Sequence, residues 1–271
     1  MNIHEFPAGE FIKVLQSFRG RSDFLIPKNG LKDIIDALKK VIKDNKGRVL
    51  IRTKVKKIVV EDGVAQGVVA ESKRETLEIK ATVVISNVGP KKTIELAGAE
   101  NFDKGYLKEV AEKIRPGVGM DYLFTTDKPL LDFSGTLYTI DARRTEGWSV
   151  PTLMWAEHAP KGKHLLHTMP VPESTITYNP RKEFGILLQD LKDEFPKFEE
   201  YGGKLLLRRN FCGEWPVTRS WQGYDVTQKT PVENLYNVGD GVKPSGWIVG
   251  SGSAESARIA AQDIKARIKP Q

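Results

Sequence analysis

The 271-residue chain is long enough to bury one large hydrophobic core or two smaller ones. Its hydrophobic fraction of 39% is typical of a soluble globular protein, and no apolar run approaches the roughly 18 residues of a membrane-spanning helix. The net charge of +7 comes mostly from lysines interleaved with acidic residues, which is typical of a solvated helix face and argues against a nucleic-acid surface.

The first third of the chain has the clearest predicted elements. Residues 27–47 place apolar side chains at helical spacing and end at Gly47, a residue type that often follows the last helical turn. Asp62-Gly63 is the first of two turn signals that separate three β-rich runs. These runs cover residues 48–62, 64–72 and 75–81. Residues 82–87 are apolar without alternation, which predicts a strand buried on both faces and, with the helix, an α/β domain.

The middle of the chain, residues 100–205, has a different pattern. Two helices are predicted there, over residues 103–114 and 180–195, and Pro180 suits the first turn of the second helix. The strand-like runs between them cover residues 117–127, 135–141, 149–158 and 162–170. We interpret this part as an α+β domain inserted into the first domain, because residues 234–240 again have the pattern of a buried α/β strand.

The end of the chain places an acid between two glycines and then begins a helix. Asp240 lies between Gly239 and Gly241 at the carboxyl end of the predicted strand, where open α/β sheets bind ligands. A helix is predicted from about Gly252, and its unpaired first-turn amides suit an anion or an electron-rich carbonyl. The predicted buried face of this helix consists of Ala254, Ala257, Ala261, Ile264 and Ile268. The alternative is that these glycines serve only the turn between a strand and a capped helix.

Two blocks of the sequence carry a family resemblance. Residues 235–261 resemble the C-terminal flavin signature of FAD-dependent oxidoreductases of the phytoene desaturase and amine oxidase group, above all its phytoene dehydrogenase-like members. Residues 49–90 resemble the middle block of the same family. The resemblance implies a GR2-type FAD-binding α/β domain with an inserted α+β substrate domain. The implied boundaries are 27–99 and 206–271 for the FAD-binding domain, and 1–26 and 100–205 for the substrate-binding domain.

The resemblance also implies FAD as the cofactor and gives it a set of contacts. The acid at Asp240 would hydrogen-bond the ribityl chain, and the backbone of residues 248–250 would approach the pyrimidine edge of the ring. Val55 would offer its backbone to the adenine, and Trp247 would contact the ring or the substrate. The cofactor-binding residues implied in this way are Val55, Asn87, Gly239, Asp240, Gly241, Trp247, Ile248, Val249, Gly250 and Gly252.

One departure from the family pattern concerns the phosphate-binding segment. Family members begin with a strand and a GxGxxG helix start, and the first 26 residues contain no such fingerprint. We therefore expect the FAD-binding domain to be incomplete at its N-terminus. Losing two or three charge-assisted hydrogen bonds to the pyrophosphate and ribose would cost on the order of 4–7 kcal/mol, so we expect FAD binding by this chain alone to be weak or absent.

The implied function is an FAD-dependent oxidoreductase, phytoene desaturase-like, that moves hydride between an apolar, isoprenoid-type substrate and the flavin. Two alternatives stay open: a truncated, non-catalytic fragment, or a subunit completed by a separate N-terminal polypeptide that carries the GxGxxG segment. An unpaired sheet edge would also favour a dimer. The identities of the substrate and of the electron acceptor are not encoded in any motif of the sequence.

Cysteine and histidine usage gives two further expectations. The single cysteine and the lack of a signal peptide predict a cytoplasmic protein, with peripheral contact to anionic lipid left open. His164 and His167 lie three residues apart, so on a strand they face opposite sides and would not converge on one metal. We therefore predict no metal site.

Overall fold

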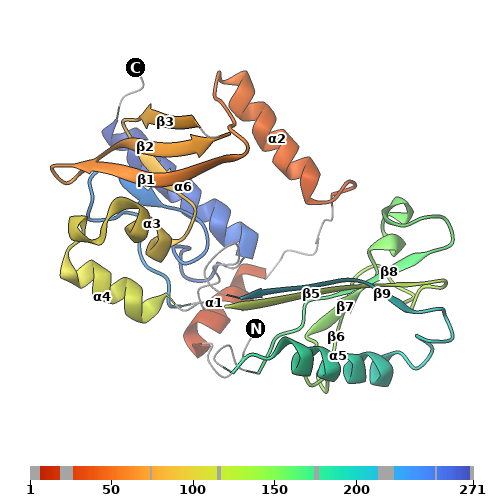
Figure 1. The fold of residues 1–271 in the computed structure, drawn as a ribbon. Helices are drawn as coiled ribbons and strands as arrows, with labels where there is room; N and C mark the ends of the chain where they lie inside the picture. The colour runs from red at the N-terminus through yellow and green to blue at the C-terminus, as the bar shows by residue number, and fades with distance from the viewer. Residues whose placement is uncertain are drawn as a thin grey trace. The chain divides into compact units, whose positions relative to one another are not determined.

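A computed structural model describes residues 7–18, 27–73, 75–114, 117–173, 177–212, 223–247 and 249–268. The described residues fall into two compact units, drawn in Figure 1. The first unit contains residues 27–49 and 118–212, and the second contains residues 7–18, 50–117 and 223–268. None of the described helices is long and apolar enough to cross a membrane.

The first unit is built on a five-stranded antiparallel sheet with the strand order β6-β7-β8-β5-β9. Its strands are β5 (Val118–Thr126), β6 (Thr136–Tyr138), β7 (Gly147–Ser149), β8 (His164–Thr168) and β9 (Lys204–Cys212). This sheet shares no strand with the other sheets of the described residues. The unit also contains α2 (Leu31–Asp44) and the two 3₁₀ turns η2 (Pro151–Leu153) and η3 (Ala156–His158).

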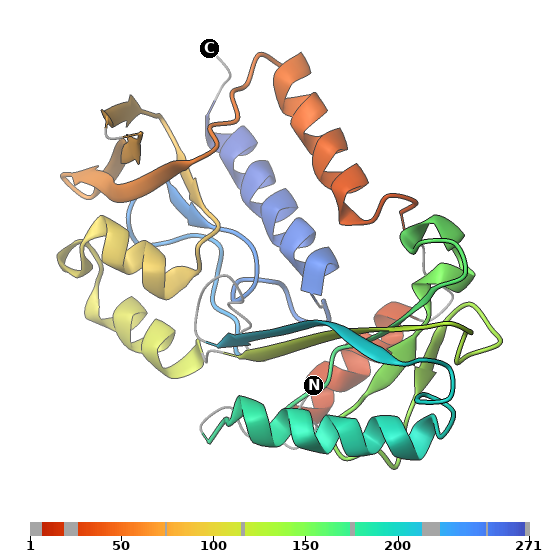
Figure 2. The ribbon, with the colours of Figure 1, turned by 45° about the vertical axis from the view of Figure 1, so that its right-hand side comes forward.

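Helix α5 (Pro180–Glu194) packs along one face of this sheet, as Figure 2 shows. The Asn179 side chain accepts hydrogen bonds from the first backbone amides of the helix, and Pro180 occupies the first turn, as predicted. Leu187 and Leu191 of α5 belong to the buried cluster that the sheet supplies with Tyr122 and other side chains. Burial of these apolar surfaces holds the helix on the sheet.

One sequence prediction for this unit is wrong, and one strand was missed. Residues 149–158 were expected to form one strand, but β7 ends at Ser149 and two 3₁₀ turns follow. Pro151 explains the difference, because a proline fixes φ and has no N–H for a ladder, whereas it suits the first position of a helical turn. Strand β9 was not predicted, and its pairing with β5 carries the sheet past residue 205.

The second unit contains an antiparallel meander and a parallel strand pair. The meander consists of β1 (Thr53–Glu61), β2 (Val64–Ser72) and β3 (Glu75–Lys80), in the order β1-β2-β3. At the first turn Asp62 and Gly63 have φ angles of 49° and 77°, which confirms the predicted turn, since a type I′ hairpin needs positive φ at both positions. Strand β4 (Val84–Ser86) pairs in parallel with β10 (Leu235–Asn237), so the structure joins segments that are far apart in the sequence.

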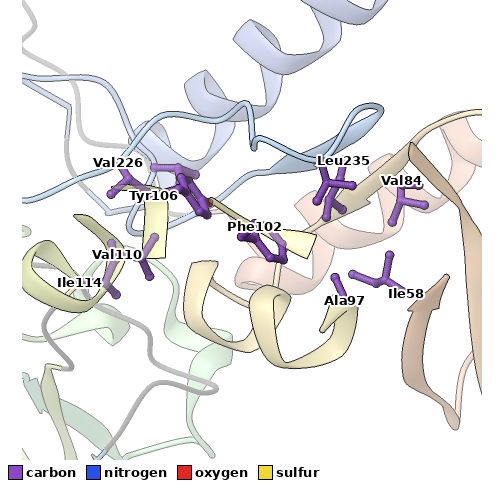
Figure 3. Packing of buried hydrophobic residues seen from close by; sticks show 12 residues of the cluster. Ile58, Val84, Ala97, Phe102, Tyr106, Val110, Ile114, Val226 and Leu235 are labelled. Atoms are coloured by element: carbon purple, nitrogen blue, oxygen red, sulfur yellow. The ribbon is translucent and has the colours of Figure 1, made fainter. Parts of the chain in front are cut away.

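The prediction that residues 82–87 are buried on both faces is wrong. Val84 and Ser86 are buried, but Ile85 between them is 52% exposed. The strand therefore buries only one face against the described residues. Its buried face belongs to a core in which Figure 3 shows Val84 and Leu235 beside Ala97.

The helices of the second unit are α1 (Ala8–Phe18), α3 (Pro90–Ala97), α4 (Lys104–Lys113) and α6 (Val249–Arg267), and η1 (Ala99–Asn101) joins α3 to α4. Tyr106 and Val110 place one face of α4 in the core (Figure 3). The carboxylate of Asp103 accepts a hydrogen bond from the Tyr106 amide at 2.8 Å and so caps α4.

Helix α6 differs from its prediction in both its start and its buried face. It begins at Val249, three residues before Gly252. The buried positions are Gly252, Ser256 and Ala260, whereas the predicted Ala254, Ala257 and Ala261 are exposed and Ile264 and Ile268 are half-buried. The two faces have similar small residues, so the pattern alone did not distinguish them. The hydroxyl of Ser256 accepts a hydrogen bond from the Gly239 amide at 2.8 Å, and this contact selects the face.

The boundaries of the two units differ from the boundaries of the predicted domains. Helix α1 lies in the second unit although residues 1–26 were assigned to the substrate-binding domain, and α2 lies in the first unit although residues 27–99 were assigned to the FAD-binding domain. Residues 206–212 likewise lie in the first unit, within β9. The assignment of substrate and FAD binding to separate domains stays a prediction.

Candidate functional site

The parallel pairing of β4 and β10 brings two predicted site segments together. Because the strands run in the same direction, Asn87 after β4 and Gly239 after β10 follow neighbouring carboxyl ends. Gly239 has a φ of 101°, and a Cβ atom there would lie 2.3 Å from Asn87 Oδ1. Glycine is therefore required, both for the backbone angle and for the close approach of the Asn87 side chain.

Asp240 is held by a buried lysine that the sequence analysis did not identify. Lys243 Nζ lies 2.9 Å from Asp240 Oδ1 and 2.8 Å from Asp225 Oδ1, and the lysine side chain is only 1% exposed. A cation this deeply buried is tolerated because carboxylates surround it. The other carboxylate oxygen, Asp240 Oδ2, is buried and has no hydrogen-bond partner among the described residues. Such an unpaired acceptor is suited to a hydroxyl or amide donor of a ligand.

The charge balance of this cluster is set by two acids that share one cation. Burial raises the pKa of Asp225, the nearby Lys243 ammonium lowers it, and the Asp240 carboxylate raises it further. Because the pKa of Asp225 is raised overall, desolvation of its carboxylate outweighs the attraction of the lysine. Gly241, next to Asp240, fixes the loop by accepting a hydrogen bond on its carbonyl from the Val226 amide at 2.9 Å.

The first turn of α6 packs against the same lysine. A Cβ atom on Gly252 would lie 3.0 Å from Lys243 Cδ and 3.3 Å from the carbonyl carbon of Trp247, so only a glycine allows this approach without a shift. The N–H groups of the first helical turn carry partial positive charge. The site therefore combines a helix start, a buried ammonium group and the Asp240 carboxylate.

Helix α1 supports the loop that leads into α6. The Glu10 carboxylate is buried and accepts hydrogen bonds from the Gly246 amide and the Ser245 hydroxyl, both at 2.5 Å. Lys13 donates from Nζ to the Ser245 hydroxyl at 2.7 Å. The Trp247 amide donates to the Pro244 carbonyl at 3.2 Å. These contacts hold the backbone of residues 244–247.

A buried polar network lies at the carboxyl ends of the strands. Asn237 of β10 is 1% exposed, its Oδ1 lies 2.7 Å from Thr93 Oγ1, and its Nδ2 donates to the Tyr106 hydroxyl at 3.1 Å. Thr93 Oγ1 also lies 2.7 Å from the Ser86 hydroxyl. Burial raises the pKa of Tyr106 to about 12, against a smaller lowering by its hydrogen bond with Asn237. The network ties β4 and β10 to α3 and α4.

The structure thus places some of the predicted site residues together and leaves others apart. The group at the strand ends and the α6 start consists of Asn87, Gly239, Asp240, Gly241, Trp247, Val249 and Gly252. Gly250 lies in the same first turn of α6 and is exposed, with no atom outside its own helix backbone within 4 Å of an added Cβ. Ile248 lies outside the described residues. Val55 lies in a different sheet, opposite Ala70, and its contact with an adenine stays a prediction.

Three functional candidates were missed by sequence reasoning: Lys243, Asp225 and Glu10. Lys243 follows Asp240 by three residues, and this spacing was the available signal. The partnership with Asp225, and that of Glu10 with the loop before α6, depend on the fold and have no local pattern.

The two histidines of β8 lie in the first unit, whereas the predicted site residues lie in the second. His164 contacts Thr152 at 3.2 Å and His167 contacts Asp121 at 2.9 Å, so the two histidines have different partners, as the alternation of a strand predicts. Within the described ranges no group of three or more candidate metal ligands is found. The first unit has a cavity of about 350 Å³, which is lined by residues 138–143 and by Asp190, Asp193 and Glu194. None of the predicted site residues lines it.

Comparison with known proteins gives a consistent family. The sequence profile described as flavin containing amine oxidoreductase matches residues 6–265. The crystal structure of an oxidoreductase from Methanosarcina mazei is 33% identical, with a TM-score of 0.86 over 95% of this chain and 60% of that one. An uncharacterized protein of Methanocaldococcus jannaschii, MJ1488, is 27% identical over 94% of this chain and 58% of its own length. The inactive all-trans-retinol 13,14-reductase of Danio rerio is 29% identical over 47% of this chain and 21% of its own length. The chain therefore spans about three fifths of the length of the first two proteins.

Proposed function

We propose, because the chain belongs to the family of flavin containing amine oxidoreductases, that it is part of an FAD-dependent oxidoreductase and that the segment from Gly239 to Gly252 holds the ring side of the flavin. The observation that carries the proposal is Asp240 Oδ2, a buried carboxylate oxygen without a partner among the described residues. The chemistry of the neighbouring residues fits a flavin, since a ribityl hydroxyl would complete this acceptor. The glycines on both sides of Asp240 have φ angles of 101° and 92°, which side chains rarely allow, and so set the loop conformation that presents the carboxylate.

The residues of this chain would then act by binding and orienting. Asp240 would accept a hydrogen bond from the polyol, and its ion pair with Lys243 holds the carboxylate in place. The first-turn amides of α6 favour negative charge at the α6 start. The bound flavin would supply the hydride acceptor, so the reaction needs no acid–base pair from the protein.

We propose an apolar, isoprenoid-type molecule as the substrate, as in phytoene desaturase-like members of the family. The support is the similarity to a protein whose name contains all-trans-retinol, an apolar polyene, although that protein is described as inactive. The support concerns the substrate class and not the direction of the reaction. The chain spans about three fifths of the length of the Methanosarcina mazei and Methanocaldococcus jannaschii relatives, so the activity and substrate of the whole protein are part of the proposal.

Titration of FAD into the purified chain by calorimetry tests the proposed site. We expect Asp240→Ala to weaken binding by about 1.5–3 kcal/mol, the range for a hydrogen bond to a charged group, or by roughly one to two decades in Kd. Asp240→Asn keeps one acceptor oxygen and should lose less. Glu95→Ala, which removes an exposed ion pair with Lys92 on α3, is the matched control and should leave Kd unchanged. An unchanged Kd in a folded Asp240→Ala variant would remove Asp240 from the site.

A further inference from the structure

A polar group and several leucines share the face of the five-stranded sheet that lies opposite α5. Helix α5 covers one face of this sheet (Figure 2), and Met120, Tyr122 and Phe124 of β5 lie in the buried cluster on that side. Successive side chains of a strand point to opposite faces, so Asp121 and Leu123 lie on the other face. Residues that pair across an antiparallel ladder share a face. The partners of β5 on this second face, all within the first unit, are Leu165, His167, Leu207 and Arg209.

The Asp121 carboxylate fixes the two polar side chains on either side of it. His167 Nε2 lies 2.9 Å from Asp121 Oδ1, and Arg209 donates from Nε to Asp121 Oδ2 at 3.0 Å. Arg209 Nη2 donates to the same Oδ2. A carboxylate only accepts hydrogen bonds, so the imidazole donates from Nε2. The neutral imidazole then carries its lone pair on Nδ1, which makes Nδ1 a hydrogen-bond acceptor.

The acceptor on His167 is oriented but unused by the described part of the chain. The hydrogen bond of Nε2 to Asp121 holds the ring, and no described residue donates to Nδ1. The charges of Asp121 and Arg209 balance each other, so the group as a whole favours a neutral donor over a cation, which would lie near the Arg209 guanidinium without a counter-ion of its own. A neutral ligand that can donate to Nδ1 is best represented by a hydroxyl group.

The surroundings of this acceptor are apolar. Leu123 pairs with His167 on one side and with Leu207 on the other, and Leu165 lies two residues from His167 on the same face of β8. None of the three leucines belongs to a buried cluster of the described residues, so their side chains are not used by the core beneath α5. Ligand sites commonly combine apolar side chains with a few placed polar groups that fix the orientation of the ligand. This face therefore suits a hydrocarbon chain that carries one hydroxyl group.

We propose that His167 recognises the hydroxyl group of an apolar alcohol, which donates a hydrogen bond to Nδ1 while its hydrocarbon chain lies over Leu123, Leu165 and Leu207. Asp121 and Arg209 act as positioning residues, because they hold the imidazole in the orientation that presents Nδ1. The inference rests on the apolar substrate class proposed above, which it narrows to alcohols. It does not rest on the proposed flavin contacts of Asp240.

Fluorescence titration of the full chain with two polyene probes tests the proposal. The probes are all-trans-retinol, which has a hydroxyl donor, and retinyl acetate, in which an ester replaces it. We expect retinol to bind roughly tenfold more tightly, because one hydrogen bond accounts for up to about one decade in Kd. His167→Phe keeps an aromatic ring without the acceptor, so it should weaken retinol binding roughly tenfold and change acetate binding by less than threefold. Lys192→Gln, at an exposed ion pair of α5, is the matched control and should change neither Kd.

A second pair of variants tests the positioning of the ring. Arg209→Met removes the guanidinium from Asp121 and should lower the preference for retinol over the acetate, whereas Arg209→Lys keeps a cation near the carboxylate and should retain most of it. His167 and Arg209 lie outside the buried clusters, so circular dichroism should show that all these variants fold like the parent chain. A purely structural role of the group would change the binding of both probes equally.

Three outcomes would overturn the proposal. Binding of neither probe would remove the apolar substrate class together with the hydroxyl contact. Equal affinities for retinol and retinyl acetate, or an equal loss of both in His167→Phe, would remove the hydroxyl contact alone and leave the group as a structural link between strands. Tighter binding of all-trans-retinylamine than of retinol would make an ammonium group the partner of His167. The titration of FAD into the Asp240→Ala variant reports on the flavin site separately, so the failure of one proposal is distinguishable from the failure of the other.

Discussion

Replacement of Lys243 by methionine should destabilise the second unit strongly. Methionine keeps most of the side-chain volume and removes the charge, which is 1% exposed and lies 2.8 Å and 2.9 Å from two carboxylates. Breaking a buried ion pair by removing one partner costs about 3–5 kcal/mol, because the remaining charge is left uncompensated. Asp240 is 23% exposed, so solvent partly compensates its carboxylate when the lysine is removed. We therefore expect the free energy of unfolding to fall by about 3 kcal/mol at pH 7, the lower end of this range.

The loss should depend on pH in a defined direction. Burial already raises the pKa of Asp225, and without the Lys243 ammonium it should rise further. A carboxyl whose pKa is raised on folding lowers stability as the pH rises from its unfolded value through its folded value. The deficit of the variant should therefore be largest at neutral pH and smaller near pH 4, where Asp225 binds a proton.

Urea unfolding followed by circular dichroism at pH 7 and pH 4 measures both effects. Adding Asp225→Asn to Lys243→Met should recover part of the lost stability, because it removes one unpaired carboxylate. Lys92→Met, at an exposed ion pair, is the matched control and should change the free energy of unfolding by no more than about 0.5 kcal/mol. A loss below about 1 kcal/mol for Lys243→Met, or the same loss at both pH values, would refute the reasoning.

Two further predictions concern the second unit. Gly239→Ala should cost about 2 kcal/mol or more in thermal unfolding, because the new Cβ would lie 2.3 Å from Asn87 Oδ1 at a φ of 101°. Gly250→Ala, with no neighbour within 4 Å, is its control and should be neutral or stabilising; equal losses in both variants would contradict the geometry. Ultraviolet titration should show Tyr106 ionising near pH 12, and stability should fall by about 2–3 kcal/mol between pH 10 and 12. Replacement by phenylalanine should abolish that fall, and a Tyr106 phenol that titrates near pH 10 would show it to be solvated.

Local chemistry made part of the fold predictable. The Asp62-Gly63 turn and the helix start at Pro180 depend on local residue types, and both are found in the structure. The strand predicted over residues 149–158 does not form, because Pro151 determines the local backbone there whatever the apolar pattern around it.

The candidate site was predictable only where one segment contains it. Asp240 and its glycines lie within a few residues of one another, so the strand end and the turn could be identified from the pattern. Asp225 and Glu10 reach the site from 18 and more than 200 residues away, through pairings that no local pattern encodes. The buried face of α6 was missed for a related reason, since Gly239 selects Ser256 through a tertiary hydrogen bond.

A comparison of riboflavin, FMN and FAD tests most directly whether the ring side of a flavin site lies in this chain. Calorimetric titration of each flavin into the 271-residue chain, and into its Asp240→Ala variant, separates the ring and ribityl contacts from those of the pyrophosphate and adenine. We predict that the three flavins bind with Kd values within about tenfold of one another and that Asp240→Ala weakens all three by roughly one to two decades. Affinities that Asp240→Ala leaves unchanged, or FAD binding with no binding of riboflavin, would contradict the claim.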